Sequence, residues 1–302
     1  MSNYVMDTPT IPAKTIVQKT KSPDSWFGID YNMNIYRGCP HGCIYCDSRS
    51  DCYRNTDFDT VKVKEDALRI VRDDLRRKVK TGVVGSGAMS DPYNPLENKL
   101  MFTRNSLELI NAFNFGASLC TKSALVARDA DVLADIAKHS PVIVKMSITA
   151  FDDDVCKLME PNVSPASERF EALAKLSDTG LFCGVLIVPV LPFITDTEEN
   201  IRQILRAAKE AGAKFAYSYM GMTLRQGNRE YFYQQLDNSG MPEVKEKYRK
   251  QFGVRYNITS LRSKKLWSVY EEECSKLGLL CSMKSIIHHY KAGYGAEQLV
   301  LF

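Results

Sequence analysis

The sequence predicts an α/β fold in which a parallel sheet is covered by helices, followed by a mainly helical C-terminal extension. Three observations lead to this prediction. Between residues 32 and 221, segments rich in apolar and β-branched residues alternate with segments of helical periodicity. Gly180 and Gly212 end two of the helical segments, as glycine often does. Beyond about Gly221 the alternation stops, and the remaining segments have mainly helical patterns.

Each predicted element has its own signal. Helix 64–80 repeats apolar residues every three or four positions, as Leu68, Val71 and Leu75 do. Strands are predicted where apolar and β-branched residues run together between glycines, as in GVVGSGA at 82–88. The predicted strands are 32–38, 82–88, 116–123, 141–149, 181–191 and 213–221. The later predicted helices are one containing Leu107, Ile110 and Phe113, and then 129–139, 166–180 and 197–212.

We expect three parts along the chain. Residues 1–26 are expected to form an N-terminal arm, residues 27–225 the α/β domain, and residues 226–302 a C-terminal helical cap and tail. An α/β barrel is an ordinary architecture for a chain of 302 residues.

Composition indicates a soluble globular protein with a large core, because 44% of the residues are hydrophobic and 25% are charged. Apolar runs such as 183–191 are too short to cross a bilayer, so no membrane association is expected. The first residues lack the basic start and apolar core of a secretory signal. We therefore expect a cytoplasmic protein whose nine cysteines stay reduced.

A basic segment stands out against the modest net charge of +4. Residues 244–265 contain eight Lys or Arg against the single Glu246, with Tyr248, Phe252 and Tyr256 interleaved. Such a segment could follow a phosphate backbone and stack bases. Alternatively, it is a solvated helix whose aromatic side chains enter the core, and this second interpretation is favoured because charged helix faces are common.

The segment YRGCPHGCIYC places Cys39, Cys43 and Cys46 within eight residues, and Gly38 and Gly42 break any helix there. A structural zinc site needs four ligands, and a ferredoxin sequence provides four cysteines for each cluster. Three thiolates can hold three irons of a cubane 4Fe–4S cluster and leave the fourth iron open. A zinc site or a purely structural loop is the alternative.

This loop resembles the signature of the radical S-adenosylmethionine (radical SAM) superfamily, and further segments are similar to its spore photoproduct lyase-like proteins. The resemblance covers most of residues 31–256. The segments are YRGCPHGCIYC, SDPYNPLE, TKSALVARDADVL, SITAFDDDVCKLMEPNVSPASERFEAL and VPVLPFITD.

The resemblance implies a partial TIM barrel, (β/α)6, with its active site at the C-terminal ends of the strands. It implies that Cys39, Cys43 and Cys46 bind a 4Fe–4S cluster whose open iron chelates S-adenosyl-L-methionine. Reductive cleavage of this cofactor then gives a 5′-deoxyadenosyl radical, with electrons from a donor such as flavodoxin or ferredoxin. It further implies a lyase, a role in DNA repair and DNA as a partner.

The family blocks also imply cofactor-binding residues. Tyr45 would face the adenine or ribose, with packing against the loop as the alternative. Ser90 and Asp91 would contact the methionyl part, although an aspartate before Pro92 could simply form a turn or cap a helix. Lys122 would pair with the cofactor carboxylate and Ser147 would bind the ribose. For both, an ordinary strand end is the alternative.

Two positions depart from the lyase pattern. Ala88 stands where the lyase has the cysteine that donates a hydrogen atom to the product radical, and Asp47 replaces a tyrosine next to the third cluster cysteine. True spore photoproduct repair is therefore in doubt. Cys120 lies on the same strand face as Lys122 and is a weak candidate for a substitute donor, but a buried strand cysteine is the favoured interpretation.

The last residues, QLVLF, resemble the peptide by which bacterial repair proteins bind the sliding clamp. Gln298, Leu299, Leu301 and Phe302 would enter an apolar groove of that partner. The alternative is that these side chains fold back onto the protein's own core.

Two other functions stay open from the sequence. The radical chemistry could act on a peptide or small molecule instead of nucleic acid. Alternatively, the chain could be a non-catalytic iron–sulfur protein that senses redox state or binds nucleic acid.

Overall fold

A seven-stranded sheet forms the centre of the computed structural model, which describes residues 8–23 and 25–294. Six strands run parallel in the order β10-β9-β8-β7-β6-β3, and an antiparallel strand, β2, flanks β3. This arrangement confirms the predicted α/β fold and its partial barrel of six parallel strands. The parallel strands are β3 (Tyr31–Met33), β6 (Val83–Ser86), β7 (Gly116–Thr121), β8 (Val142–Ser147), β9 (Cys183–Ile187) and β10 (Phe215–Ser218).

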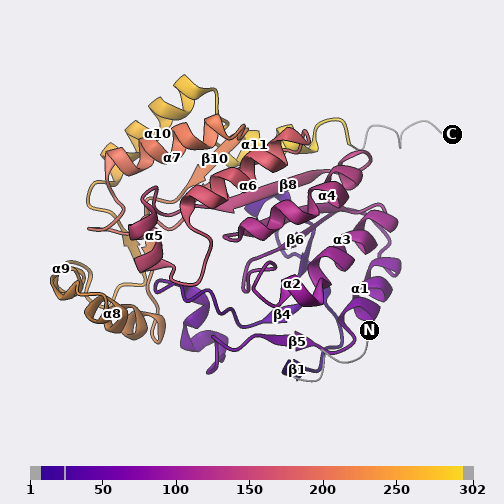
Figure 1. The fold of residues 1–302 in the computed structure, drawn as a ribbon, viewed down its shortest axis with the longest axis horizontal. Coiled ribbons are helices and arrows are strands. Elements are labelled where there is room, and N and C mark those ends of the chain that lie inside the picture. Colours follow the sequence, from indigo (N-terminus) through magenta and orange to yellow (C-terminus); the bar gives the residue numbers. More distant parts are fainter. Residues whose placement is uncertain (1–7, 24, 295–302) are drawn as a thin grey trace.

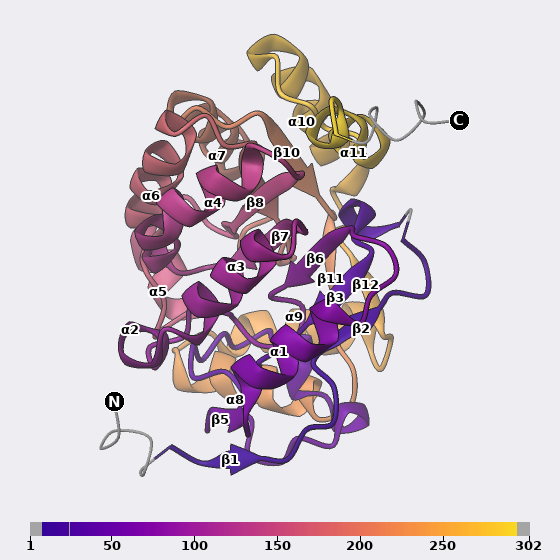
Figure 2. The same cartoon turned by 90° about the vertical axis from the view of Figure 1, so that its right-hand side faces the viewer.

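Helices between successive strands form a layer on one side of the sheet (Figure 1, Figure 2). Each turns an apolar stripe towards the strands, as Ile201, Ile204 and Leu205 do in α7. These helices are α1 (Ala67–Arg76), α3 (Phe102–Ala112), α4 (Ala130–Ala137), α6 (Ala166–Asp178) and α7 (Glu198–Glu210). Shorter helices, α2 (Glu97–Leu100) and α5 (Asp153–Met159), precede α3 and α6.

The C-terminal elements pack at two places. Helices α8 and α9 share an apolar cluster with Cys43 and Tyr45, whereas α10 packs on α7 and α11 contacts the short helix η1. Figures 1 and 2 show the α8–α9 pair and α11 at opposite ends of the molecule. The segment is mainly helical as predicted, but its helices do not form one cap, because their apolar faces cover separate surfaces. The elements are β11 (Gly221–Thr223), α8 (Asn228–Asn238), α9 (Pro242–Phe252), β12 (Asn257–Thr259), α10 (Ser263–Leu277) and α11 (Met283–Lys291), with η1 at Trp26–Gly28.

The two faces of the sheet have different surroundings. Val144 of β8 joins the core under the outer helices, whereas Ile143 packs on the opposite face with Phe27 and with Ile286 of α11. Side chains alternate along a strand, so Lys145 extends on the same face as Ile143, nearer the C-terminal end of β8. The inner face is therefore apolar at the N-terminal end of the strand and polar at the end where barrel active sites lie.

Two predicted strands are shorter than the sequence suggested. Predicted strand 32–38 divides into β3 and β4 (Tyr36–Arg37), and β4 pairs with β5 (Lys62–Lys64) in a small sheet that also contains β1 (Thr10–Ile11). Predicted strand 181–191 ends at Ile187, shortly before Pro189, which has no backbone N–H for a sheet.

Part of the expected N-terminal arm belongs to the sheet. Residues Val17–Lys19 form β2, which pairs antiparallel with β3. Asp74 of α1 holds this segment by accepting hydrogen bonds from the backbone N–H groups of Ile16 (2.7 Å) and Val17 (3.0 Å) and from the Thr15 hydroxyl (2.9 Å). The sequence did not indicate this strand, because its pairing partners lie far away along the chain.

The proposed clamp-binding residues Gln298, Leu299, Leu301 and Phe302 lie outside the described residues, so sliding-clamp docking stays a prediction. Likewise, the expected domain boundary at residue 225 stays a prediction, although β11 and β12 pair across it. Within residues 8–23 and 25–294, no helix has the length and apolar character needed to span a bilayer.

We expect Asp74→Ala to lower the free energy of unfolding by about 3 kcal/mol, because two buried N–H groups would lose a charged acceptor. Urea unfolding monitored by circular dichroism measures this loss. The matched control is Asp73→Ala, which removes only the partner of the Arg72 side chain and should cost less than about 0.5 kcal/mol. Equal losses in the two variants would contradict the anchoring role of Asp74.

Candidate functional site

The three cysteines of the loop surround one cavity. Cys39, Cys43 and Cys46 are free thiols that line a space of about 120 Å³. Gly38 and Gly42 have positive φ angles, +84° and +69°, which explains the glycines on either side of Cys39. A Cβ atom at Gly38 would also collide with the backbone carbonyl oxygen of Thr60. The loop conformation that brings the thiols together therefore depends on glycine.

The thiol environment suits a cluster better than a single ion. Burial raises the pKa of Cys39 to about 12, even though the backbone N–H groups of Asp91 and His41 favour its thiolate. Metal binding would therefore have to displace protons from these thiols. Among the residues that the structure describes, no three His, Cys, Asp or Glu side chains converge closely enough to bind one metal ion. Three thiols that line one shared space match the ligand set of a cluster with one open iron, whereas a structural zinc site needs a fourth ligand.

Ser90 and Asp91 form one wall of this cavity and make hydrogen bonds to the protein. The Ser90 hydroxyl donates to the carbonyl oxygen of Gly38 in the cysteine loop. The Asp91 carboxylate accepts from the Thr121 hydroxyl (2.6 Å) and from the backbone N–H of Lys122 (2.8 Å). It also accepts from the backbone N–H of Tyr93, as in the turn that the sequence left open as an alternative. Both side chains thus link the cysteine loop to the ends of β6 and β7.

Lys122 follows β7, lines the cysteine cavity and lies near the buried carboxylate of Glu160. Burial acts to lower the pKa of Lys122, but the Cys43 thiol and the Glu160 carboxylate outweigh it and raise the pKa. The Lys122 ammonium is 5.8 Å from the centre of the Tyr45 ring. It is therefore a cation held at the edge of the cluster cavity.

Tyr45 is buried, and its hydroxyl contacts two residues that do not line the cysteine cavity. It donates to Glu160 and lies 3.1 Å from the Thr149 hydroxyl. Glu160 in turn pairs with the fully buried Arg169 at 2.5 Å. Arg169 also donates to the backbone carbonyl oxygen of Ser147 (2.9 Å), so this network connects the loop to the end of β8.

Sequence reasoning missed the roles of Glu160 and Arg169, although both lie in the block MEPNVSPASERF. Burial acts to raise the pKa of Glu160, but the charges of Arg169 and Lys122 reverse the effect and lower it. Residue type alone could not pair this carboxylate with this guanidinium, which come together through the turn between α5 and α6.

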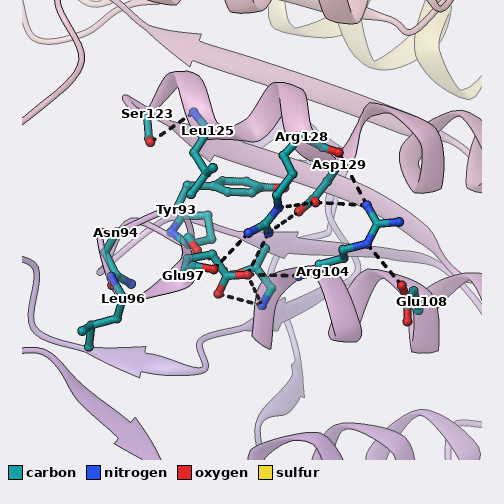
Figure 3. Close-up of polar contacts among 12 residues, drawn as sticks. Tyr93, Asn94, Leu96, Glu97, Arg104, Glu108, Ser123, Leu125, Arg128 and Asp129 are labelled. Atoms are coloured by element: carbon teal, nitrogen blue, oxygen red, sulfur yellow. Dashed lines mark hydrogen bonds and ion pairs between the residues drawn. The ribbon is translucent and has the colours of Figure 1, made fainter. Parts of the chain in front are cut away.

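A second buried network connects the segments SDPYNPLE and TKSALVARDADVL (Figure 3). Glu97 accepts from Arg128 (3.0 Å) and from the backbone N–H of Thr103 (3.0 Å). Asp129 accepts from Arg128 (2.7 Å) and from Arg104 (3.3 Å). Because Glu97 and Asp129 are both fully buried, this network fixes the segments that follow β6 and β7.

A larger cavity of about 280 Å³ occupies the inner face of the sheet, at the C-terminal ends of the strands. It shares Gly87, Ala88, Cys120 and Lys122 with the cysteine cavity, so the two spaces adjoin. This is the position where barrel enzymes bind substrates. Its other polar lining residues are Asn32, Ser86, Ser118, Lys145 and Ser147.

Lys145 is the unexpected residue of this cavity. It is only 2% exposed, donates to the Ser118 hydroxyl and lies 4.8 Å from the centre of the Phe27 ring. Burial lowers its pKa to about 8. The sequence contained a signal, because a lysine interrupts the apolar strand PVIVKMSIT at a position that shares its face with Ser147.

Cys120 and Ser147 both line the larger cavity. Cys120 lines both cavities, and burial raises the pKa of its thiol. Ser147 donates to the carbonyl oxygen of Val188 (3.2 Å) and lines the larger cavity. Their functional roles stay predictions.

The basic segment 244–265 divides into core and surface. Tyr248 and Phe252 are buried beside the cysteine loop, which favours the solvated-helix interpretation for these aromatic residues. Tyr256 is 41% exposed, and the Arg225 guanidinium lies 4.4 Å from the centre of its ring.

Comparisons with known proteins identify the family. The family model described as "Radical SAM superfamily" matches residues 33–208, which include the cysteine loop and most of the sheet. The chain belongs to the radical SAM superfamily. A protein of uncharacterised function from Mycobacterium tuberculosis is 31% identical to it over 229 residues, which cover 74% of this chain and 67% of that protein.

Solved structures of spore photoproduct lyase, a radical SAM enzyme, have the same fold. The lyase complexed with a dinucleoside spore photoproduct superposes with a TM-score of 0.67 at 14% identity, covering 89% of this chain and 79% of the lyase. A lyase variant with bound AdoMet and the same dinucleoside gives a TM-score of 0.62 at 15% identity, with 84% and 76% coverage. Radical SAM enzymes use a 4Fe–4S cluster and S-adenosylmethionine as cofactors.

We expect Lys145→Met to make this radical SAM protein more stable below pH 8. A pKa lowered from 10.5 to about 8 means that folding disfavours the protonated lysine by about 3 kcal/mol. The unfolded chain keeps this proton up to about pH 10.5, so the penalty is complete below pH 8 and fades as the pH rises towards 10.5.

Denaturant unfolding at pH 7 and pH 10 measures the difference between the variant and the wild-type protein. The buried cysteines titrate in both proteins, so their contributions to the pH dependence of the free energy of unfolding cancel in the difference. Lys138→Met, at an exposed position at the C-terminal end of α4, should leave the stability unchanged within about 0.5 kcal/mol. A Lys145→Met variant that is less stable than the wild type at pH 7 would show that the ammonium is compensated inside the protein.

Proposed function

We propose that this radical SAM enzyme is a lyase that acts on nucleic acid, with Cys39, Cys43 and Cys46 as the ligands of its 4Fe–4S cluster. The observation that carries the proposal is the arrangement of three free thiols around one cavity that adjoins a polar cavity inside the barrel. When the cluster is reduced by one electron, the cluster and bound S-adenosylmethionine would supply a 5′-deoxyadenosyl radical that abstracts a hydrogen atom.

Residues at the junction of the two cavities would hold the cofactor. Lys122 is the cation that would pair with its carboxylate, because it lines both cavities. Asp91 and Ser90 line the cysteine cavity beside it and would receive the methionyl part. Ser147 would face the ribose from β8. Tyr45 would support this arrangement through its ring, since its hydroxyl is bound to Glu160.

Two observations support nucleic acid as the substrate. Spore photoproduct lyase, which has this fold, has been solved with a dinucleoside photoproduct. In addition, Lys247, Lys250 and Arg255 are exposed and form no ion pair with any residue in 8–23 and 25–294. Unpaired surface cations can bind phosphates at little desolvation cost.

The reaction need not be identical to that of the lyase. Ala88 cannot donate a hydrogen atom, whereas Cys120 lines both cavities and has a thiol hydrogen. We propose Cys120 as the hydrogen-atom donor if the reaction of this enzyme needs one. Flavodoxin or ferredoxin is the proposed electron donor.

Cys43→Ala should abolish cluster assembly, because two thiolates cannot hold a cubane in place of three. Iron analysis and the visible spectrum after anaerobic reconstitution measure the cluster. Cys52→Ala is the control, since Cys52 lies in the next turn but does not line the cysteine cavity, and it should retain full iron. Full iron and an unchanged spectrum in Cys43→Ala would refute the ligand assignment.

The substrate proposal predicts that ultraviolet-irradiated DNA increases 5′-deoxyadenosine formation by the reduced enzyme over unirradiated DNA. Lys247→Glu with Lys250→Glu should weaken DNA binding about tenfold at low salt, because two cations are reversed. Cofactor cleavage without DNA should stay unchanged in this variant. Lys175→Glu with Lys209→Glu, at exposed positions of α6 and α7, is the charge-matched control and should bind DNA normally. Two results together would contradict a nucleic-acid substrate. Irradiated DNA would leave 5′-deoxyadenosine formation unchanged, and the double variant would bind DNA as the wild type does.

A further inference from the structure

We propose that Lys145, Ser118 and Asn32 form an oxyanion-binding subsite in the barrel cavity, which receives a phosphate or carboxylate group of the substrate. The proposal rests on the proposed function in one respect, because it takes this cavity as the place where the substrate of a radical SAM enzyme binds. It adds the chemical class of the group that the cavity recognises.

The first argument is the uncompensated charge of Lys145. An ammonium that is removed from water needs a nearby anion or a full set of hydrogen-bond acceptors. Lys145 is 2% exposed and forms no ion pair with any described residue. The fourteen lining residues of the cavity include two lysines and no Asp, Glu or His. A ligand that enters the cavity can supply the missing negative charge.

The second argument is the geometry around the ammonium. A lysine ammonium has three N–H donors, and the Ser118 hydroxyl accepts from one of them. The Phe27 ring, 4.8 Å away, covers another side with its electron-rich face. Donors that remain can point into the cavity, where Asn32 also lines the wall and makes no side-chain hydrogen bond to the described residues. These groups can together satisfy an oxyanion.

The third argument separates Lys145 from Lys122. Lys122 lies near Cys43 and Glu160, whose charges raise its pKa, and it lines the cysteine cavity as well. Among the described residues, only the Cys120 thiol acts to raise the pKa of Lys145, and no carboxylate does so. Lys145 also lines only the larger of the two cavities. The cavity therefore has one cation next to the cluster site and a second cation for another molecule.

Strand register places the subsite next to the candidate hydrogen-atom donor. Cys120 of β7 and Lys145 of β8 are paired residues of neighbouring parallel strands, and both line the cavity. An oxyanion bound at Lys145 would therefore hold the adjoining atoms of the substrate close to Cys120. Anion recognition would fix the orientation of the substrate relative to the reactive end of the cavity.

The test is direct binding of radiolabelled sulfate to the reconstituted protein with S-adenosylmethionine present, measured by equilibrium dialysis. We expect one saturable site that Lys145→Met weakens at least tenfold. Lys138→Met, which removes an exposed lysine, should bind sulfate as the wild type does. Wild-type affinity in Lys145→Met, when that variant is folded by circular dichroism and retains its iron, would overturn the proposal.

Competition identifies the source of the oxyanion. Displacement of sulfate by thymidine 5′-monophosphate supports a phosphate, and displacement by acetate supports a carboxylate. If uncharged thymidine displaced sulfate as effectively as the monophosphate does, the proposal would be overturned, because binding would then not depend on the negative charge. The assay needs no reductant, so it is independent of catalysis. Lys145-dependent sulfate binding without 5′-deoxyadenosine formation would reject the proposed function and leave the anion subsite intact.

Discussion

The carboxylate of Asp91 is the contact on which the arrangement of the site depends. It accepts from the Thr121 hydroxyl and the Lys122 backbone at the end of β7, and it holds its own turn after β6. His41 of the cysteine loop lies 3.5 Å from the same carboxylate. One side chain thus joins two strand ends to the loop. The position of the thiols and of Lys122 relative to the barrel follows from this junction.

Buried charges around the site fall into two classes. Arg169 is paired with Glu160, and Arg128 is paired with both Glu97 and Asp129. Arg169 also donates hydrogen bonds to backbone carbonyl oxygens. Such pairs hold loops in place, since removing one member would leave an uncompensated charge. Lys145 has no comparable partner in the described part of the chain. The paired charges therefore hold loops in place, whereas Lys145 lines the cavity without an ion pair to the described residues.

The C-terminal helices support this arrangement from two directions. Tyr248 and Phe252 of α9 lie in one apolar cluster with Cys43 and Tyr45, so the C-terminal extension packs against the cysteine loop. At the other end, Tyr290 of α11 donates to the backbone carbonyl oxygen of Phe27, whose ring covers Lys145. Both contacts join residues far apart in sequence. A barrel without the extension would expose the loop and the end of its inner cavity.

The sequence by itself determined the alternation of strands and helices, the cysteine loop and the positions of Lys122 and Ser147 at strand ends, because local periodicity and spacing encode these features. Only the tertiary structure decided that residues 17–19 join the sheet, that Tyr45 turns its hydroxyl to Glu160, and that Lys145 is an unpaired cation. Each of these depends on contacts between distant segments. The sequence does not distinguish a strand lysine that contacts water from one that contacts a carboxylate or lines a cavity. Only the contacts of the folded chain decide which of these surroundings the lysine has.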